Sequence, residues 1–104
     1  MIQLNLQYED ENLTNTIVEK LSREKLVLEM VEMRDVHILC YEETHLVKKK
    51  CVQLTAITKS LLFNKIMEEL RKLDPDQQIK VFALPVVQSG FNQTQDLFDR
   101  LLKV

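Results

Sequence analysis

The chain has 104 residues, of which 45% are hydrophobic and 29% are charged, and its formal net charge at pH 7 is −2. This length and composition are typical of a soluble globular protein rather than a disordered one, and we expect one domain over residues 1–104. The small negative charge provides no general attraction to nucleic acid or to anionic lipid, so neither is expected as a partner.

Three further features narrow the classes of function. The N-terminal sequence MIQLNLQYEDEN has no basic leader, and no window approaches the ~18 apolar residues of a membrane-spanning helix, so we expect a cytoplasmic protein. Gly90 is the single glycine, which excludes glycine-rich phosphate loops. Cys40 and Cys51 are too few for a disulfide framework, and we expect reduced thiols.

The first elements are a strand and a helix. Residues 2–8, IQLNLQY, alternate between apolar and polar side chains, which predicts a half-buried strand. Apolar residues then recur at helical spacing and predict a helix over residues 11–24. Glu19 and Arg23, four residues apart on its polar side, are expected to form an ion pair. The apolar positions of this helix are Leu13, Ile17, Val18 and Leu21.

Two alternating runs around a short polar connection predict a long β-hairpin. Its first strand is expected to cover residues 26–41, with the Arg34-Asp35 pair bulging or kinking the strand rather than ending it. Its second strand includes KCVQLTAIT, residues 50–58, and the turn is expected around Thr44 to Val47.

A second helix is predicted over residues 60–73, with Ser60 as its cap. Its apolar stripe consists of Leu62, Ile66, Leu70 and Leu73. Asp74-Pro75-Asp76 ends this helix, because the residue before a proline avoids helical torsions. The nearly continuous apolar run over residues 79–87 suits an interior strand with both faces covered.

The stretch KVFALPVVQSG, residues 80–90, links that strand to a last helix. Pro85 is expected at a strand end, an edge or a bulge, where its missing N–H faces no partner. Gly90 is expected to supply the positive φ that turns the chain. The last helix is predicted to begin at Asn92 or Thr94. The apolar residues that it is expected to bury are Leu97, Phe98, Leu101 and Leu102.

The order of elements is therefore β-α-β-β-α-β with an added C-terminal helix. This order is typical of the ferredoxin-like split βαβ fold, an α+β architecture in which two helices cover one face of an antiparallel sheet.

Histidine and cysteine residues in the hairpin are the first candidates for chemistry. His37 and Cys40 are three positions apart on a strand and point to opposite faces, so a metal ion shared by them is not expected. With a turn around Thr44 to Val47, Cys40 and Cys51 would face each other across the strands, nearly close enough for a disulfide. His45 in the connection would complete a loose cluster, whereas a shift of one residue would separate the thiols.

Lysine and aspartate residues are the remaining candidates. Lys48 and Lys50 belong to a basic run that serves either as a solvated strand end or, with Lys59 or Arg34, as an anion site.

Asp74 and Asp76 offer hard oxygen ligands for a divalent metal, but the same residues are ordinary helix-ending chemistry. No Ser-His-Asp or Cys-His pairing and no paired carboxylates in an apolar setting are evident, so we do not expect an enzyme and assign no catalytic residue.

Several motifs resemble those of the CutA divalent-cation-tolerance family, whose members are trimers within the wider PII-like group. The first helix ends near EKL, residues 24–26, as it does in this family, and ITKSLLFNKIMEELRKLDP is similar to the family's second helix with its leucine-x-proline ending. Ala83-Leu84-Pro85-Val86 matches an ALPI-type strand, which is followed by a polar, glycine-containing turn and a final helix. The resemblance spans nearly the whole chain.

The chain also departs from the family pattern. Where the family usually has histidine, proline, tyrosine and glutamate, this chain has the sequence DPDQ at residues 74–77. A cysteine common after the first helix falls near Glu29, and an aromatic cluster of the second strand is reduced to Tyr41. The metal motif of the family is therefore degraded here.

The resemblance implies a homotrimer whose long hairpins pair with neighbouring subunits and cover the sheet edges. It also implies a binding or regulatory role linked to divalent metal tolerance, with a divalent metal as the cofactor it suggests. The alternative is a PII-like sensor of a nucleotide or another small anion at subunit clefts, using Lys48, Lys50 or Lys59.

Overall fold

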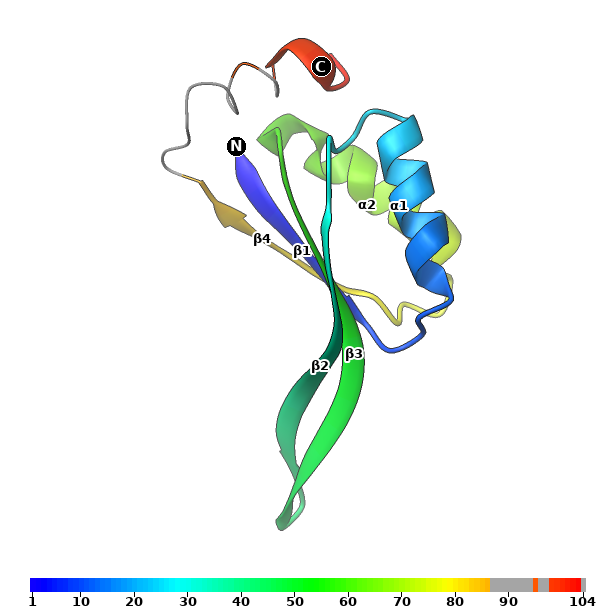
Figure 1. Cartoon of the computed structure of the whole chain (residues 1–104), viewed down its shortest axis with the longest axis vertical. Helices are drawn as coiled ribbons and strands as arrows, with labels where there is room; N and C mark the ends of the chain where they lie inside the picture. Colours follow the sequence, from blue (N-terminus) through cyan, green and yellow to red (C-terminus); the bar gives the residue numbers. More distant parts are fainter. Residues whose placement is uncertain (87–94, 96–97, 104) are drawn as a thin grey trace.

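The structure, a computed structural model of the chain, describes residues 1–86, 95 and 98–103. Four strands form one antiparallel sheet in the order β2-β3-β1-β4. Two helices, α1 and α2, pack together beside this sheet, and the β2–β3 hairpin projects beyond them (Figure 1). The element order is the predicted β-α-β-β-α-β, so the ferredoxin-like α+β fold is confirmed.

Strand β1 covers Ile2–Tyr8, as predicted, and lies in the middle of the sheet between β3 and β4. Its alternate residues Leu4, Leu6 and Tyr8 are buried in the core against the helices. Asn5, on the opposite face, is buried too, because a central strand is flanked on both sides.

Helix α1 covers Leu13–Arg23, close to the predicted range. Ile17 and Leu21 are fully buried, and the predicted ion pair between Glu19 and Arg23 is present at 3.5 Å. Lys25, just beyond the helix, has a φ of 58°, and this left-handed residue turns the chain back toward the sheet.

Strand β2 covers Val31–Glu42 and begins five residues later than predicted. Leu26 and Val27 are buried instead in the connection, where both N–H groups donate to the Leu21 carbonyl oxygen. These two N–H groups therefore cap the C-terminal end of α1 and cannot also pair with a neighbouring strand. The predicted bulge is confirmed, since the register shifts between Met33 and Val36.

Strand β3 covers His45–Thr58 and forms a long hairpin with β2. Glu42 pairs with His45, so the turn consists of Glu43 and Thr44 and lies earlier than the predicted Thr44–Val47. Glu43 has a φ of 58°, a conformation that a two-residue hairpin turn commonly requires.

The second helical segment begins with a 3-10 turn over Ser60–Leu62 and continues as α2 over Phe63–Leu73. Lys59 occupies the capping position before this turn, so the prediction that Ser60 is the cap is wrong. The predicted apolar stripe is confirmed: Leu62, Ile66 and Leu70 are buried, and Leu73 is partly buried.

Strand β4 covers Lys80–Pro85 and lies at the edge of the sheet. The prediction of an interior strand with both faces covered is therefore wrong within one chain. In the part of the chain that the structure describes, β4 pairs with β1 alone, and Phe82 and Leu84 are 43% and 49% exposed. Pro85 is the last residue of the strand, one of the positions expected for it.

The C-terminal segment returns to the core through Leu101, which is buried. Gln95 and residues 98–100 are helical, whereas the predicted helix start at Asn92 or Thr94, the positive φ of Gly90 and the burial of Leu97 lie outside the described residues. Phe98 and Leu102 are 61% and 40% exposed, so their predicted burial is wrong within one chain.

Candidate functional site

The hairpin register separates the two cysteines. Cys40 pairs with Val47, and Cys51 pairs with Val36, so the prediction that the thiols face each other is wrong. The turn lies too early for that pairing, and the two positions are four residues, about 13 Å, apart along the ladder. Both cysteines are free thiols, and Cys51 is buried.

The histidines do not complete a metal site either. His37 pairs with Lys50, and the alternation of the strand directs His37 and Cys40 to opposite faces, as expected. His45 pairs with Glu42 at the hairpin turn, far along β3 from Cys51. In the part of the chain that the structure describes, no group of three or more histidine, cysteine, aspartate or glutamate residues is placed to hold a metal ion.

The Asp74 carboxylate binds backbone N–H groups and does not face a metal site. Its two carboxylate oxygens accept hydrogen bonds from the N–H groups of Gln78 and Ile79, at 2.9 and 2.8 Å. Its side chain is buried, while Asp76 is exposed. These bonds organise the connection between α2 and β4 and leave Asp74 poorly suited to coordinate an ion.

The three candidate lysines do not converge within one chain. Lys48 and Lys50 lie on the same face of β3, opposite Leu39 and His37. Lys59 follows the other end of β3, about 30 Å from Lys50 at the usual rise per residue. Its Nζ donates to the Leu102 carbonyl oxygen at 3.3 Å and lies 6.0 Å from the ring centre of Phe98.

Lys50 and Arg34 belong to an ion-pair network around the bulge. Lys50 lies 2.8 Å from Asp35 and 3.7 Å from Glu11, and the hydrogen bond from Lys50 lowers the pKa of the Asp35 carboxyl. Arg34 makes a bidentate contact with Glu32, which raises the pKa of the guanidinium. These carboxylates compete with any external anion at Lys50 and Arg34.

A second charged cluster, not predicted from the sequence, joins the two helices. The Glu69 side chain on α2 is 1% exposed, and its carboxylate lies 3.1 Å from Lys72, 3.2 Å from Lys65 and 3.3 Å from Lys20. The hydrogen bond from Lys72, supported by Lys65 and Lys20, lowers the pKa of Glu69 to about 2 despite its burial. This carboxylate is therefore ionised at neutral pH and has a structural role.

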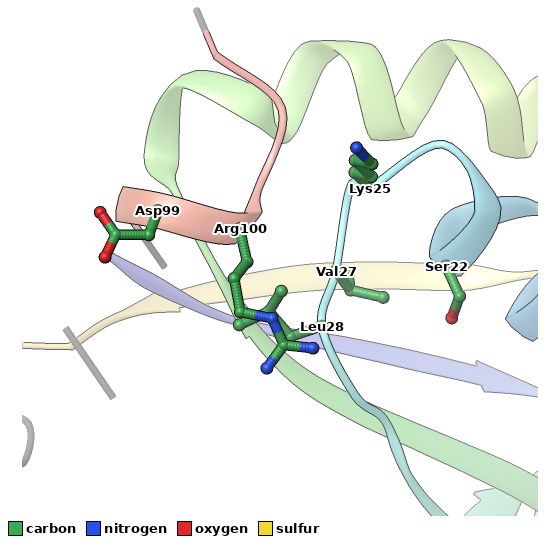
Figure 2. A pocket seen from close by; sticks show the side chains of 6 residues that line it. All are labelled: Ser22, Lys25, Val27, Leu28, Asp99 and Arg100. Carbon is green, nitrogen blue, oxygen red and sulfur yellow. The ribbon is translucent and has the colours of Figure 1, made fainter. Parts of the chain in front are cut away.

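A pocket of about 340 Å³ lies between the α1–β2 connection and the C-terminal turn (Figure 2). Its lining residues are Ser22, Lys25, Val27, Leu28, Asp99 and Arg100. Two of these side chains are cationic and one is anionic, and Val27 and Leu28 supply the apolar part. Sequence reasoning missed this pocket, because its two segments are more than 70 residues apart.

The face of the sheet opposite α1 and α2, here called the open face, carries many apolar side chains. The register and the alternation of the strands place the following residues on it: Val31, Met33, Val36, Ile38, Cys40, Val47, Cys51, Ile57, Phe82 and Leu84. Val31 is 62% exposed. Met33, Phe82 and Leu84 are exposed as well, whereas Cys51 is buried and the other residues of this set are half-buried. Exposed apolar side chains gathered on one face of a sheet are typical of an interaction site.

Polar side chains in the middle of the open face already bond to each other. Gln7 donates to Gln53 at 3.2 Å, and Thr55 donates to Asn5 at 3.2 Å. Because these groups have partners inside the chain, covering the open face would leave few of their hydrogen bonds unmade.

The fold is shared with several solved CutA structures. CutA1 from Oryza sativa superimposes with a TM-score of 0.85 at 14% identity, covering 99% of this chain and 94% of the rice chain. The divalent cation tolerance protein CutA1 from Thermus thermophilus gives 0.81 at 20% identity, covering 97% and 99% of the two chains. CutA1 from Pyrococcus horikoshii gives 0.83 at 16% identity over 99% and 100%.

These similarities confirm the resemblance to CutA proteins at the level of the fold. The Thermus thermophilus protein among them is described as a divalent cation tolerance protein. No protein-family model matches the sequence, and no curated protein matches it.

Proposed function

We propose that residues 1–104 form a single CutA-like domain that assembles as a homotrimer and acts as a binding or regulatory protein. The observation that carries this proposal is the similarity in fold over nearly the whole chain, with TM-scores of 0.80–0.85 to CutA structures. The link to divalent metal tolerance follows from the description of those relatives, and the family metal motif is degraded in this chain.

The edge strand β4 and the exposed apolar residues of the hairpin support the homotrimer. Among the described residues, no strand pairs with the outer edge of β4. The hairpin leaves Leu39 and Tyr41 57% and 77% exposed on the side of β2 away from the open face. An exposed sheet edge and long apolar strands favour aggregation, and assembly into an oligomer prevents this by covering them.

Static light scattering on the purified protein tests the assembly. We expect a mass three times that of one chain, and a stable monomer would contradict the proposal. Elemental analysis of the same sample tests the degraded metal motif, for which we expect no bound divalent metal at stoichiometric amounts.

The alternative, a sensor of a nucleotide or small anion that uses Lys48, Lys50 or Lys59, stays a prediction. Within one chain Lys59 lies far from Lys48 and Lys50, and Lys50 is already paired with Asp35, so the structure gives this alternative no added support.

The location in the cell also stays a prediction. Among the described residues, no helix is long and apolar enough to cross a membrane. One relative of the same fold, from Archaeoglobus fulgidus, is described as periplasmic, whereas the sequence of this chain favours the cytoplasm.

A further inference from the structure

We propose that Glu11 is a salt-sensitive latch that holds the projecting part of the β2–β3 hairpin against the body of the domain. This part, residues 36–51, is here called the arm. When the latch opens, the arm pivots at the bulge formed by Arg34 and Asp35. Latch and pivot belong to one chain, so the proposal does not rest on the proposed trimer.

The arm begins where the four-stranded sheet ends. Tyr8, the last residue of β1, pairs with Val52, and the β3 residues before Val52 pair with β2 alone in the described part of the chain. The arm is therefore a two-stranded ribbon, which bends more easily than a sheet, and Figure 1 shows it extending beyond both helices. Because Leu39 and Tyr41 on the arm are 57% and 77% exposed, the position of the arm determines where this apolar surface is presented.

The bulge lies at the same boundary and is the natural pivot. The regular pairing of β2 with β3 stops after Met33 and resumes at Val36, with Arg34 and Asp35 between them. Asp35 has a φ of 59°, and this left-handed residue changes the local direction of the strand. The interrupted ladder is therefore the place where the arm changes its angle to the sheet with the smallest loss of strand pairing.

Glu11 joins the body of the domain to both strands of the hairpin. One carboxylate oxygen lies 3.7 Å from the Arg34 guanidinium on β2, and the other lies 3.7 Å from the Lys50 ammonium group on β3. The backbone of Glu11 belongs to the turn that begins α1, since its carbonyl oxygen accepts from the Thr14 N–H at 3.1 Å. A side chain fixed to the body thus holds the hairpin on both sides of the bulge.

The latch is weak enough to open. The side chains of Glu11, Arg34 and Lys50 are about half exposed, and exposed ion pairs contribute little each and are screened by salt. Both cations also keep a partner when Glu11 releases them, because Glu32 binds Arg34 at 3.1 Å and Asp35 binds Lys50 at 2.8 Å. Opening therefore leaves neither cation unpaired, and the closed and open positions differ little in free energy.

The test measures residual dipolar couplings of the full-length ¹⁵N-labelled protein in a stretched neutral gel. Spectra are recorded at about 0.01 M and about 0.5 M NaCl, between which the Debye length falls from about 30 Å to about 4 Å. At low salt we expect the couplings of the arm amides to fit the same alignment as those of β1 and α1. At high salt we expect the arm couplings to shrink relative to those of β1 and α1, because the arm then samples several orientations.

Two variants make the test specific. Glu11→Gln removes the latch, and we expect its arm couplings to be reduced at low salt to the values that the wild type reaches at high salt. The control is Glu19→Gln, which removes the same charge and breaks the exposed ion pair between Glu19 and Arg23 within α1. Its arm couplings are expected to match those of the wild type at both salt concentrations.

Arm couplings that are equal in the wild type and Glu11→Gln at low salt, or a wild-type arm that does not respond to salt, would overturn the proposal. An equal loss in the Glu19 variant would show that net charge alone moves the arm and would contradict a latch at Glu11. Thermal melts verify that both variants are folded. Light scattering on the same samples reports the assembly separately, so a rigid arm in an intact trimer counts against the latch and not against the CutA-like assembly.

Discussion

The carboxylate of Glu69 on α2 lies 3.3 Å from the ammonium group of Lys20 on α1 and so joins the two helices across their contact. The same carboxylate receives Lys65 and Lys72 from its own helix, and its side chain is almost completely buried. A buried charge of this kind is tolerated because it is paired, and removing it takes away the carboxylate that the three lysines share, although Lys20 keeps its ion pair with Glu24 at 3.6 Å. Both the stability of the protein and the pH dependence of that stability should therefore reflect this cluster.

Replacing Glu69 by glutamine is expected to destabilise the protein. A neutral amide cannot balance the three ammonium groups, which would repel each other, and the contact between α1 and α2 would weaken. The change is measured as the shift of the urea midpoint. The control is Glu68→Gln on the exposed side of α2, which is expected to shift the midpoint several times less. Equal shifts in the two variants would mean that the cluster does not stabilise the fold.

The same cluster predicts how stability depends on pH. The pKa of Glu69 in the folded protein is about 2, below its ordinary value of 4.5, so the unfolded chain binds this proton more readily. The contribution of Glu69 is therefore complete above pH 4.5 and is lost as the pH falls toward 2. We expect the difference in unfolding free energy between the wild type and Glu69→Gln to be constant from pH 7 to 5 and to shrink below pH 4.5. A difference that grows on acidification would contradict this assignment.

Asp74 provides a third prediction. Replacing it by alanine removes the acceptor for the N–H groups of Gln78 and Ile79, and we expect a loss of about 1–3 kcal/mol in the free energy of unfolding. Chemical denaturation measures this loss. Asp76→Ala is the matched control, because Asp76 is exposed and its replacement is expected to change stability by less than about 0.5 kcal/mol. Similar losses in both variants would argue against the structural role of Asp74.

The open face provides a fourth prediction. Leu84 on β4 is 49% exposed in the single chain, and the proposed trimer would cover it. Leu84→Glu would bury an unpaired carboxylate in that interface, and we expect subunit association to weaken roughly tenfold or more. Sedimentation at several concentrations measures the effect. Leu61→Glu serves as the control, because Leu61 is 73% exposed in the turn before α2 and does not belong to the sheet. Unchanged association of the Leu84 variant would place the subunit contact elsewhere.

Local patterns predicted the elements of this fold well. The alternation of residues 2–8 predicted β1, since a strand with one face on the core has a period of two. The apolar stripe of α2 and the ion pair between Glu19 and Arg23 follow from neighbours three or four residues apart on a helix. Each of these features depends on residues close in sequence.

Register and strand order were decided by the tertiary structure. A turn at Glu43 and Thr44, earlier than expected, moved every pair of the hairpin and separated Cys40 from Cys51. The apolar run before Pro85 indicated an interior strand, but the chain places β4 at the sheet edge.

The same distinction applies to the sites. The spacing of Lys65, Glu69 and Lys72 is visible in the sequence, but the burial of Glu69 depends on the packing of α1, which also supplies Lys20. The pocket with Lys25 and Arg100 needs two distant segments to be joined by the Leu102 N–H bond. Hydrophobic periodicity is a local property and determined the elements, whereas contacts between distant segments exist only once the chain has folded.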